Sequence, residues 1–209
     1  MSKNKKINII NKHVLNNKKE YILVTLIFII GIFLGVMFIN NSKEEQRAEI
    51  TAYLNNYVET IKNTEKLETT KMLKTSFLHN IGIGIALWFF GTTLIGIPIV
   101  FGIILYKGFC LGYTISATII TLGIGKGMTF ILTVLLLQNI IFVPCIIAIA
   151  VSGIKLYKSI VRDKNRENIK MEVIRHTLFS SIMVIILLVA SVVEILISTN
   201  IFKKIIKYF

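Results

Sequence analysis

Long apolar runs alternate along the chain with short stretches rich in charge, the pattern of a protein that crosses a membrane several times. The first charge-free run covers 21–39, a second covers 77–106, and a third covers 127–154. About 20 residues at roughly 1.5 Å rise each span a hydrocarbon core of ~30 Å. Because a single segment satisfies its backbone in lipid as a helix, we predict an all-α fold: a polytopic membrane helical bundle.

The apolar runs divide into about five predicted spans. Residues 21–39 form the first span, 77–153 supply spans two to four, and 177–209 hold the last span and a tail. Residues 77–106 are too long for one perpendicular crossing. They form either one helix that bends near Pro98, or two elements that separate at Gly96 or at Lys107. With either alternative, the predicted number of membrane spans is about five.

The segment 40–76 is predicted to be an extracytoplasmic amphipathic helical loop. Its apolar residues recur at helical spacing and its charged residues occupy the other face. This stripe packs either on the protein's own membrane domain or against an extracytoplasmic partner. For the second alternative, the predicted partner-contact residues are Tyr53, Leu54, Tyr57, Val58 and Ile61.

Charge sets the predicted orientation. The formal net charge is +13, and its basic residues concentrate in 1–20 and 154–176, whereas 40–76 is neutral. Positive charge at the ends of apolar spans is a topology signal, so we exclude nucleic acid as a partner and expect contact with membrane lipid. We predict a multi-pass protein of the cell membrane with a cytoplasmic amino terminus (1–20) and a basic cytoplasmic loop (154–176). Five spans place the carboxy-terminal lysines outside, against the rule.

Three polar side chains inside apolar spans form the predicted structural polar core: Gln138, Asn139 and Glu194. Polar groups at membrane depth need protein partners. We interpret the two amides as a fastener between helices, with a substrate path as the alternative. Glu194 is expected to face inward in a structural role, with proton transport as its alternative.

Small residues and prolines mark predicted helix-packing positions. Gly31 and Gly35 form one G-x-x-x-G, and Gly108 and Gly112 form another. Such pairs let a second helix approach closely, which makes a homodimer possible. The other expected packing positions, where helices bend or break, are Pro98 and Pro144.

None of the usual catalytic signatures occurs. The sequence has no C-x-x-C, H-E-x-x-H, G-x-S-x-G or P-loop pattern. Cys110 and Cys145 lie in apolar segments as small hydrophobic residues. The histidines are predicted to be interfacial, with His79 and Asn80 in a helix-entry network. We therefore expect no enzyme activity, no cofactor and no metal.

The order and spacing of several motifs resemble the stage II sporulation protein M family. These are Lys107-Gly108 followed by Gly112, the run Q-N-I-I-F-V-P over 138–144, and the A-S-V-V-E segment that ends at Glu194. Leu137 stands where many members have a proline, which removes the helix break expected there. The similarity covers nearly the whole chain.

The resemblance implies a membrane protein of endospore-forming bacteria that acts at the mother-cell septal membrane during engulfment. It implies a scaffold for two partners that degrade the cell wall, a peptidoglycan hydrolase and, through it, a lytic transglycosylase. The alternative is a permease-like transmembrane subunit of a transporter, which works with a cytoplasmic ATPase that binds residues 154–176.

Overall fold

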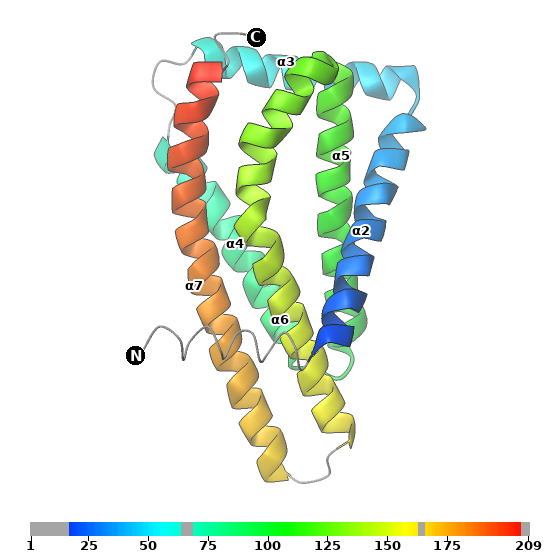
Figure 1. The fold of residues 1–209 in the computed structure, drawn as a ribbon, viewed down its shortest axis with the longest axis vertical. Coiled ribbons are helices and arrows are strands. Elements are labelled where there is room, and N and C mark those ends of the chain that lie inside the picture. The colour runs from blue at the N-terminus through cyan, green and yellow to red at the C-terminus, as the bar shows by residue number, and fades with distance from the viewer. Residues whose placement is uncertain (1–16, 64–68, 163–165, 206–209) are drawn as a thin grey trace.

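The computed structural model describes residues 17–63, 69–162 and 166–205 (Figure 1). Within these ranges its description of side chains omits 57–63, 69–73, 134, 137–138, 166 and 193–205. The described part of the chain is helical and contains no strand, which confirms the all-α prediction. The elements are α2 (Lys18–Asn40), α3 (Glu44–Asn63), α4 (Thr69–Gly91), α5 (Gly96–Phe130), the π-helical turn η1 (Ile131–Leu135), α6 (Leu136–Arg162) and α7 (Arg166–Ile205).

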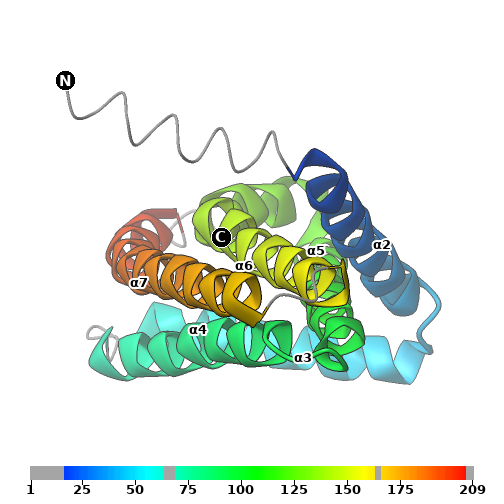
Figure 2. The ribbon, with the colours of Figure 1, turned by 90° about the horizontal axis from the view of Figure 1, so that it is seen from below.

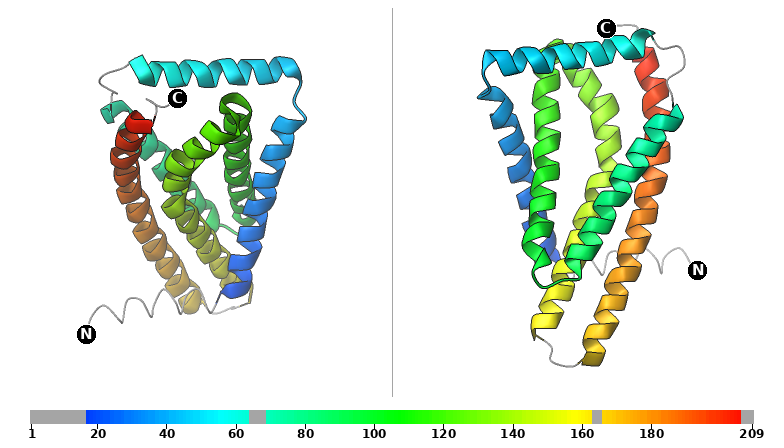
Figure 3. Two further views of the ribbon diagram at one scale, coloured as in Figure 1. Left: turned by 45° about the horizontal axis from the view of Figure 1, so that its top comes forward. Right: turned by 180° about the vertical axis from the view of Figure 1, so that it is seen from behind.

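Five lengthwise passes make up the described bundle: α2, α4, α5, the return through η1 and α6, and α7 (Figures 1 and 3). Four helices among the described residues are long and apolar enough to cross a membrane, and α4 runs beside them. The α5 helix reverses at Gly123, whose φ of 77° suits glycine. Gly127 then returns close to Ile119: a side-chain carbon at Gly127 would lie 3.1 Å from that residue's Cα.

The structure decides where residues 77–106 divide. Helix α4 ends at Gly91, and α5 begins at Gly96 after a four-residue turn. A side-chain carbon at Gly96 would lie 1.9 Å from the carbonyl oxygen of Phe90, so the tight turn requires glycine. Pro98 follows in the first turn of α5, where a missing N–H costs no helical hydrogen bond. Lys107 lies within continuous helix, so the alternative break at that residue is wrong.

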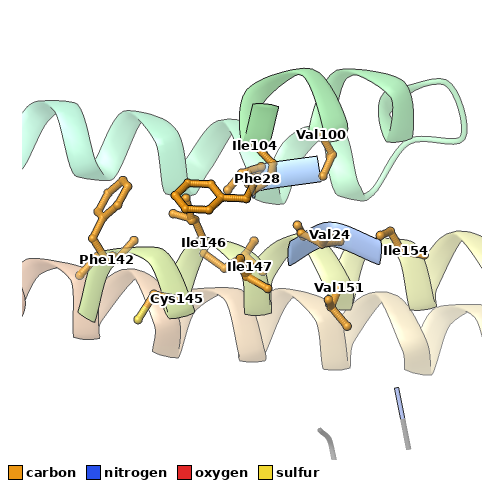
Figure 4. Close-up of a cluster of buried hydrophobic side chains, with 14 of the residues drawn as sticks. Val24, Phe28, Val100, Ile104, Phe142, Cys145, Ile146, Ile147, Val151 and Ile154 are labelled. Carbon is orange, nitrogen blue, oxygen red and sulfur yellow. The ribbon is translucent and has the colours of Figure 1, made fainter. Parts of the chain in front are cut away.

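Helix α6 is the centre of the bundle (Figure 2). In the 18-residue membrane-spanning stretch of α6, 67% is buried inside the protein. The corresponding share is 28% for each of the other three long apolar helices. Figure 4 shows its side chains meeting those of α2 and α5; the cluster includes Val24, Phe28, Val100, Ile104, Phe142, Cys145, Ile146, Ile147, Val151 and Ile154. The outer helices instead expose large apolar side chains, as lipid contact requires.

The two G-x-x-x-G motifs pack against each other within one chain. A side-chain carbon at Gly35 would lie 2.2 Å from the Phe109 carbonyl oxygen, and one at Gly112 would lie 2.0 Å from that of Ile32. Gly31 and Gly108 approach the opposite backbone equally closely. These glycines therefore let α5 pack closely against α2. The face predicted for a homodimer is therefore covered within this chain, and the homodimer itself stays a prediction.

Pro144 lies inside α6, where it removes one backbone hydrogen bond. It follows η1, whose wider turn also interrupts the regular ladder of hydrogen bonds. The pass bends in this middle part (Figure 1).

Helix α3 lies across one end of the bundle, which we call the α3 end (Figure 3). Its contact is with α5, where Thr51 and Thr121 place their hydroxyl oxygens 3.5 Å apart. The reversal at Gly123 and the end of α7 lie at this same end. Three reversals thus separate α2 from α6, so the start of α2 and the far end of α6 both lie at the end opposite α3 (Figure 1).

The predicted cytoplasmic loop 154–176 is mostly helix. Helix α6 continues to Arg162 and α7 begins at Arg166, so the two helices project beyond α4 and α5 as a hairpin (Figure 1). Glu172 pairs with Lys155 at 3.4 Å and with Arg175 at 2.6 Å. The basic residues here therefore lie on a helical hairpin, because both helices continue beyond the apolar core.

Candidate functional site: a lysine inside the bundle

Lys107 lies near the middle of the α5 pass. It follows the start of the helix at Gly96 by eleven residues and precedes the reversal at Gly123 by sixteen. At a rise of 1.5 Å per residue it is roughly 17 Å from one end and 24 Å from the other. A hydrocarbon core of ~30 Å therefore encloses this position. A cation at such depth costs about 2.5 to 3.5 kcal/mol on insertion scales, which makes it a functional-site candidate.

Two neighbours contact the Lys107 amine. The Lys107 Nζ lies 2.5 Å from the Nε2 of His79 on α4 and 5.2 Å from the centre of the Phe142 ring on α6. An ammonium donates and cannot accept, so the His79 nitrogen accepts this hydrogen bond. The ring face attracts the cation. Within the described part of the chain, none of the ion pairs supplies Lys107 with a carboxylate.

A polar cavity of about 140 Å³ surrounds these groups. It lies where α2, α4, α5, η1 and α6 meet, and its lining combines apolar side chains with the polar ones of His79, Asn80, Lys107, Thr114 and Asn139. A second, apolar cavity shares Leu111, Leu135 and Asn139 with the first. The two spaces adjoin at the end of η1, where Leu135 lines both of them.

The predicted amide fastener differs from what the structure shows. The Asn139 side-chain nitrogen donates to the Leu135 carbonyl oxygen at 2.8 Å, a bond within its own pass. Leu135 is the last residue of η1, and Asn139 also lines the cavity. The side chains of Gln138 and Glu194 lie outside the described residues, and their roles stay predictions.

Hydrogen bonds between helices come from other residues. Asn80 donates to the Ser191 hydroxyl at 2.6 Å, and Trp88 donates to the Thr177 hydroxyl at 3.1 Å, so both bonds join α4 to α7. The sequence had suggested neither pair. The signal was present, because Ser191 is a small polar residue in an apolar span.

His176 is a further internal contact and not an interfacial residue. Its ring is 2% exposed. Nδ1 lies 2.9 Å from the Ser152 hydroxyl and Nε2 lies 3.3 Å from the Trp88 carbonyl. Both ring nitrogens are thus used to join α4, α6 and α7. This role is structural.

His79 also departs from its prediction as a helix-entry residue. It precedes the end of α4 by twelve residues, so it lies at the depth of Lys107, to which it bonds. The signal that could have identified this site was Lys107 itself, a lone cation within apolar sequence. The rule that a charged residue inside a membrane span indicates a functional site had been applied only to Glu194.

The predicted partner-contact stripe on α3 does not form one exposed face. Tyr53 is 73% exposed, whereas Ile50 and Leu54 are half-buried on the side that faces the bundle. For those two residues the alternative of packing on the protein's own membrane domain is correct. The side chains of Tyr57, Val58 and Ile61 lie outside the described residues.

Among the described residues, no group of three or more His, Cys, Asp or Glu side chains could hold a metal. Cys145 is buried and Cys110 half-buried, and both are free thiols.

Comparison with known proteins identifies the family. No curated protein and no solved structure matches the chain. Residues 24–199 match the family described as "SpoIIM: Stage II sporulation protein M". The matched range includes α3 and every residue of the polar cavity. This chain, a helical membrane protein, therefore belongs to the stage II sporulation protein M family.

Proposed function

We propose that the protein is a non-enzymatic membrane scaffold that recruits and localises peptidoglycan-degrading enzymes at the septum during engulfment. The supporting observation is the position of α3, which lies across the bundle and presents an outer face (Figure 3). Family membership supports a role in sporulation. The expected partners are a peptidoglycan hydrolase and, through it, a lytic transglycosylase.

Opposite faces of α3 have opposite environments. Arg47, Ile50, Thr51 and Leu54 are half-buried, whereas Glu45, Glu49, Ala52 and Tyr53 are exposed. Residues at this spacing share a helix face. The inner face fixes the helix on α5, so the outer face is held in a constant orientation. A rigid support lowers the entropy that binding costs.

Tyr53 is the residue on this outer face best suited to anchor a partner. Tyrosine is enriched among residues that dominate binding energy, because it offers a large apolar ring and a polar tip. At 73% exposure its ring is available to a partner on the α3 end. The acidic Glu45 and Glu49 beside it favour a partner with a basic surface.

The test replaces Tyr53 with serine in sporulating cells that depend on this chain. We expect septal enrichment of a fluorescent hydrolase to fall about tenfold, the loss typical of a strong interface residue. Asn55→Ser is the matched control, since Asn55 is exposed on the flank of the same helix. Unchanged enrichment with Tyr53→Ser, at a normal level of the membrane protein, would contradict the role of α3.

One observation favours the permease-like alternative: the polar cavity lies within the membrane passes. A transporter of this kind needs an ATPase, which would bind the basic hairpin of α6 and α7. Purification from membranes in mild detergent distinguishes the two functions. A stoichiometric ATPase in the purified complex would replace the scaffold by the permease, and a complex that contains the hydrolase without an ATPase supports the scaffold.

A further inference from the structure

The Lys107 amine carries more N–H donors than the described residues accept in hydrogen bonds. An ammonium carries three N–H donors. One is accepted by His79, and the Phe142 ring contacts the cation through its face. Two carboxylates of the described residues pair with other cations: Glu20 with Lys158, and Glu172 with Lys155 and Arg175. Lys107 is half-buried, and a cation at membrane depth without a counter-charge is unfavourable.

The depth of the amine selects the kind of anion. Lipid phosphates lie at the membrane surface, roughly 15 Å from the centre of the hydrocarbon core. Lys107 is close to that centre, and α5 continues as helix in both directions from it. An anion that reaches this depth without its own hydration is therefore one carried by a helix, such as an aspartate or glutamate side chain.

The cavity reaches the outer surface of the bundle at α4, because its lining residue His79 is exposed. From their connecting turn the two helices separate towards the α3 end, with α6 behind them (Figure 3). His79 is exposed, and the apolar residues beside the opening face outward: Leu78 is 63% and Tyr106 61% exposed. A partner that enters here comes from within the membrane.

The surface beside His79 also permits close approach by a helix. Gly82 follows His79 by one turn and is exposed, and a side-chain carbon there would meet no atom within 4 Å. Glycine at such a position lets two helix backbones come together. Together with Leu78 it gives the α4 side of the opening a shallow apolar surface.

We propose that this groove binds a transmembrane helix of a partner protein that carries an aspartate or glutamate at mid-membrane depth. The carboxylate pairs with Lys107, and His79 orients the amine by accepting one of its hydrogen bonds. Apolar residues of the partner helix cover Leu78, Gly82 and Tyr106. This inference goes beyond the proposed function and does not depend on α3.

The experiment uses the full chain in phosphatidylcholine vesicles with a synthetic single-span peptide of leucine and alanine. One peptide carries aspartate at its centre, and the matched peptide carries asparagine there. Energy transfer from a labelled peptide to the labelled protein reports association. We expect the aspartate peptide to bind about tenfold more tightly, and Lys107→Met to abolish this preference.

A second measurement needs no variant, so a folding defect cannot imitate it. When the aspartate is moved to the last turn of the peptide, the preference should disappear, because the carboxylate no longer reaches the depth of Lys107. Equal binding of the central aspartate and asparagine peptides overturns the proposal. An aspartate preference that persists in Lys107→Met also overturns it.

Other occupants give different results. If added phosphatidylglycerol removes the preference, an anionic lipid occupies the groove and the proposal is wrong. If the protein alone self-associates in the same vesicles and Lys107→Met prevents this, the occupant is a second copy. Retained binding of the aspartate peptide with hydrolase recruitment unchanged in Tyr53→Ser would leave this proposal standing while contradicting the function of α3.

Discussion

Two faces of α5 contrast sharply. Towards α2 the helix presents Gly108 and Gly112, and the backbones touch. Towards α4 it presents Lys107, and the helices enclose a polar cavity. Lys107 and Gly108 are consecutive, and successive residues of a helix point about 100° apart. One dipeptide thus serves both a close contact between helices and a cation that pairs with no carboxylate in the ion pairs of the described residues.

The difference shows how a membrane bundle separates structure from function. Lipid tails are as apolar as leucine, so helices are held together by close packing and hydrogen bonds. The α2 face uses the first means and leaves no space for a ligand. On the α4 face a cavity replaces close packing around Lys107. Helix α4 is held instead by hydrogen bonds to α7. Space and charge therefore coincide on the α4 face.

The largest expected effect follows from adding bulk to the tight face. In Gly112→Leu a side-chain carbon would meet the Ile32 carbonyl oxygen at 2.0 Å, so α2 must move away. We expect a loss of more than about 3 kcal/mol in the free energy of unfolding. Unfolding by dodecyl sulfate in mixed micelles measures it. Gly102→Leu is the matched control in the same helix, since no atom lies within 4 Å of the added carbon; an equal loss in both variants would refute the contrast.

A smaller loss is expected from the hydrogen bond that holds α4. Asn80→Leu removes the donor to Ser191, and the Ser191 hydroxyl keeps its bond to the Leu187 carbonyl at 2.9 Å. No buried group loses its only partner, so we expect about 1 kcal/mol. The same unfolding titration applies. A loss as large as that of Gly112→Leu would show that α4 depends on this bond more than α2 depends on its glycines.

Lys107→Met should change stability by less than about 1 kcal/mol in either direction. Methionine keeps the length of the side chain and removes a charge whose burial is unfavourable. Near-neutral stability together with loss of the aspartate-peptide preference would separate the site from the framework. A destabilisation above about 3 kcal/mol in the unfolding titration would instead make Lys107 part of the framework.

The smallest effect is expected at the surface end of α2. Glu20→Gln removes the ion pair with Lys158, whose side chain is 47% exposed. Such pairs contribute about 0 to 1 kcal/mol, and we expect the lower part of that range in salt. Thermal unfolding at low and high ionic strength measures it. A large, salt-dependent loss would show that α2 is held by charge and not by its glycine face.

Membrane spans could be predicted from sequence because lipid imposes a strict rule on the backbone. Segments of about 20 apolar residues become helices whatever lies beside them. The turn after Gly91 was harder to place, since Gly96 and Lys107 both interrupt the apolar pattern. Only the contact of Gly96 with the Phe90 carbonyl shows why the chain turns there. The extent of α6 was also underestimated, because its basic end continues as helix.

The site was less predictable than the fold. Asn139 was identified as a polar residue that needs a partner, but its partner is the backbone carbonyl of Leu135, at the end of η1. A π-helical turn leaves no clear sequence pattern. Lys107 and His79 are separated by 28 residues and belong to different helices. Their meeting depends on how α4 and α5 rotate about their axes.

The sequence by itself determined the class of this protein: a helical membrane bundle with a polar amphipathic segment between its first two passes, and two glycine pairs suited to close contact. Tertiary structure alone decided that those glycine pairs face each other, that Leu54 faces inward and Tyr53 outward, and that Lys107 and His79 share a cavity. The physical reason is that nearly every helix surface here is apolar. Apolar surfaces satisfy lipid and protein alike, so the pattern fixes the spans and leaves the choice of neighbours to packing.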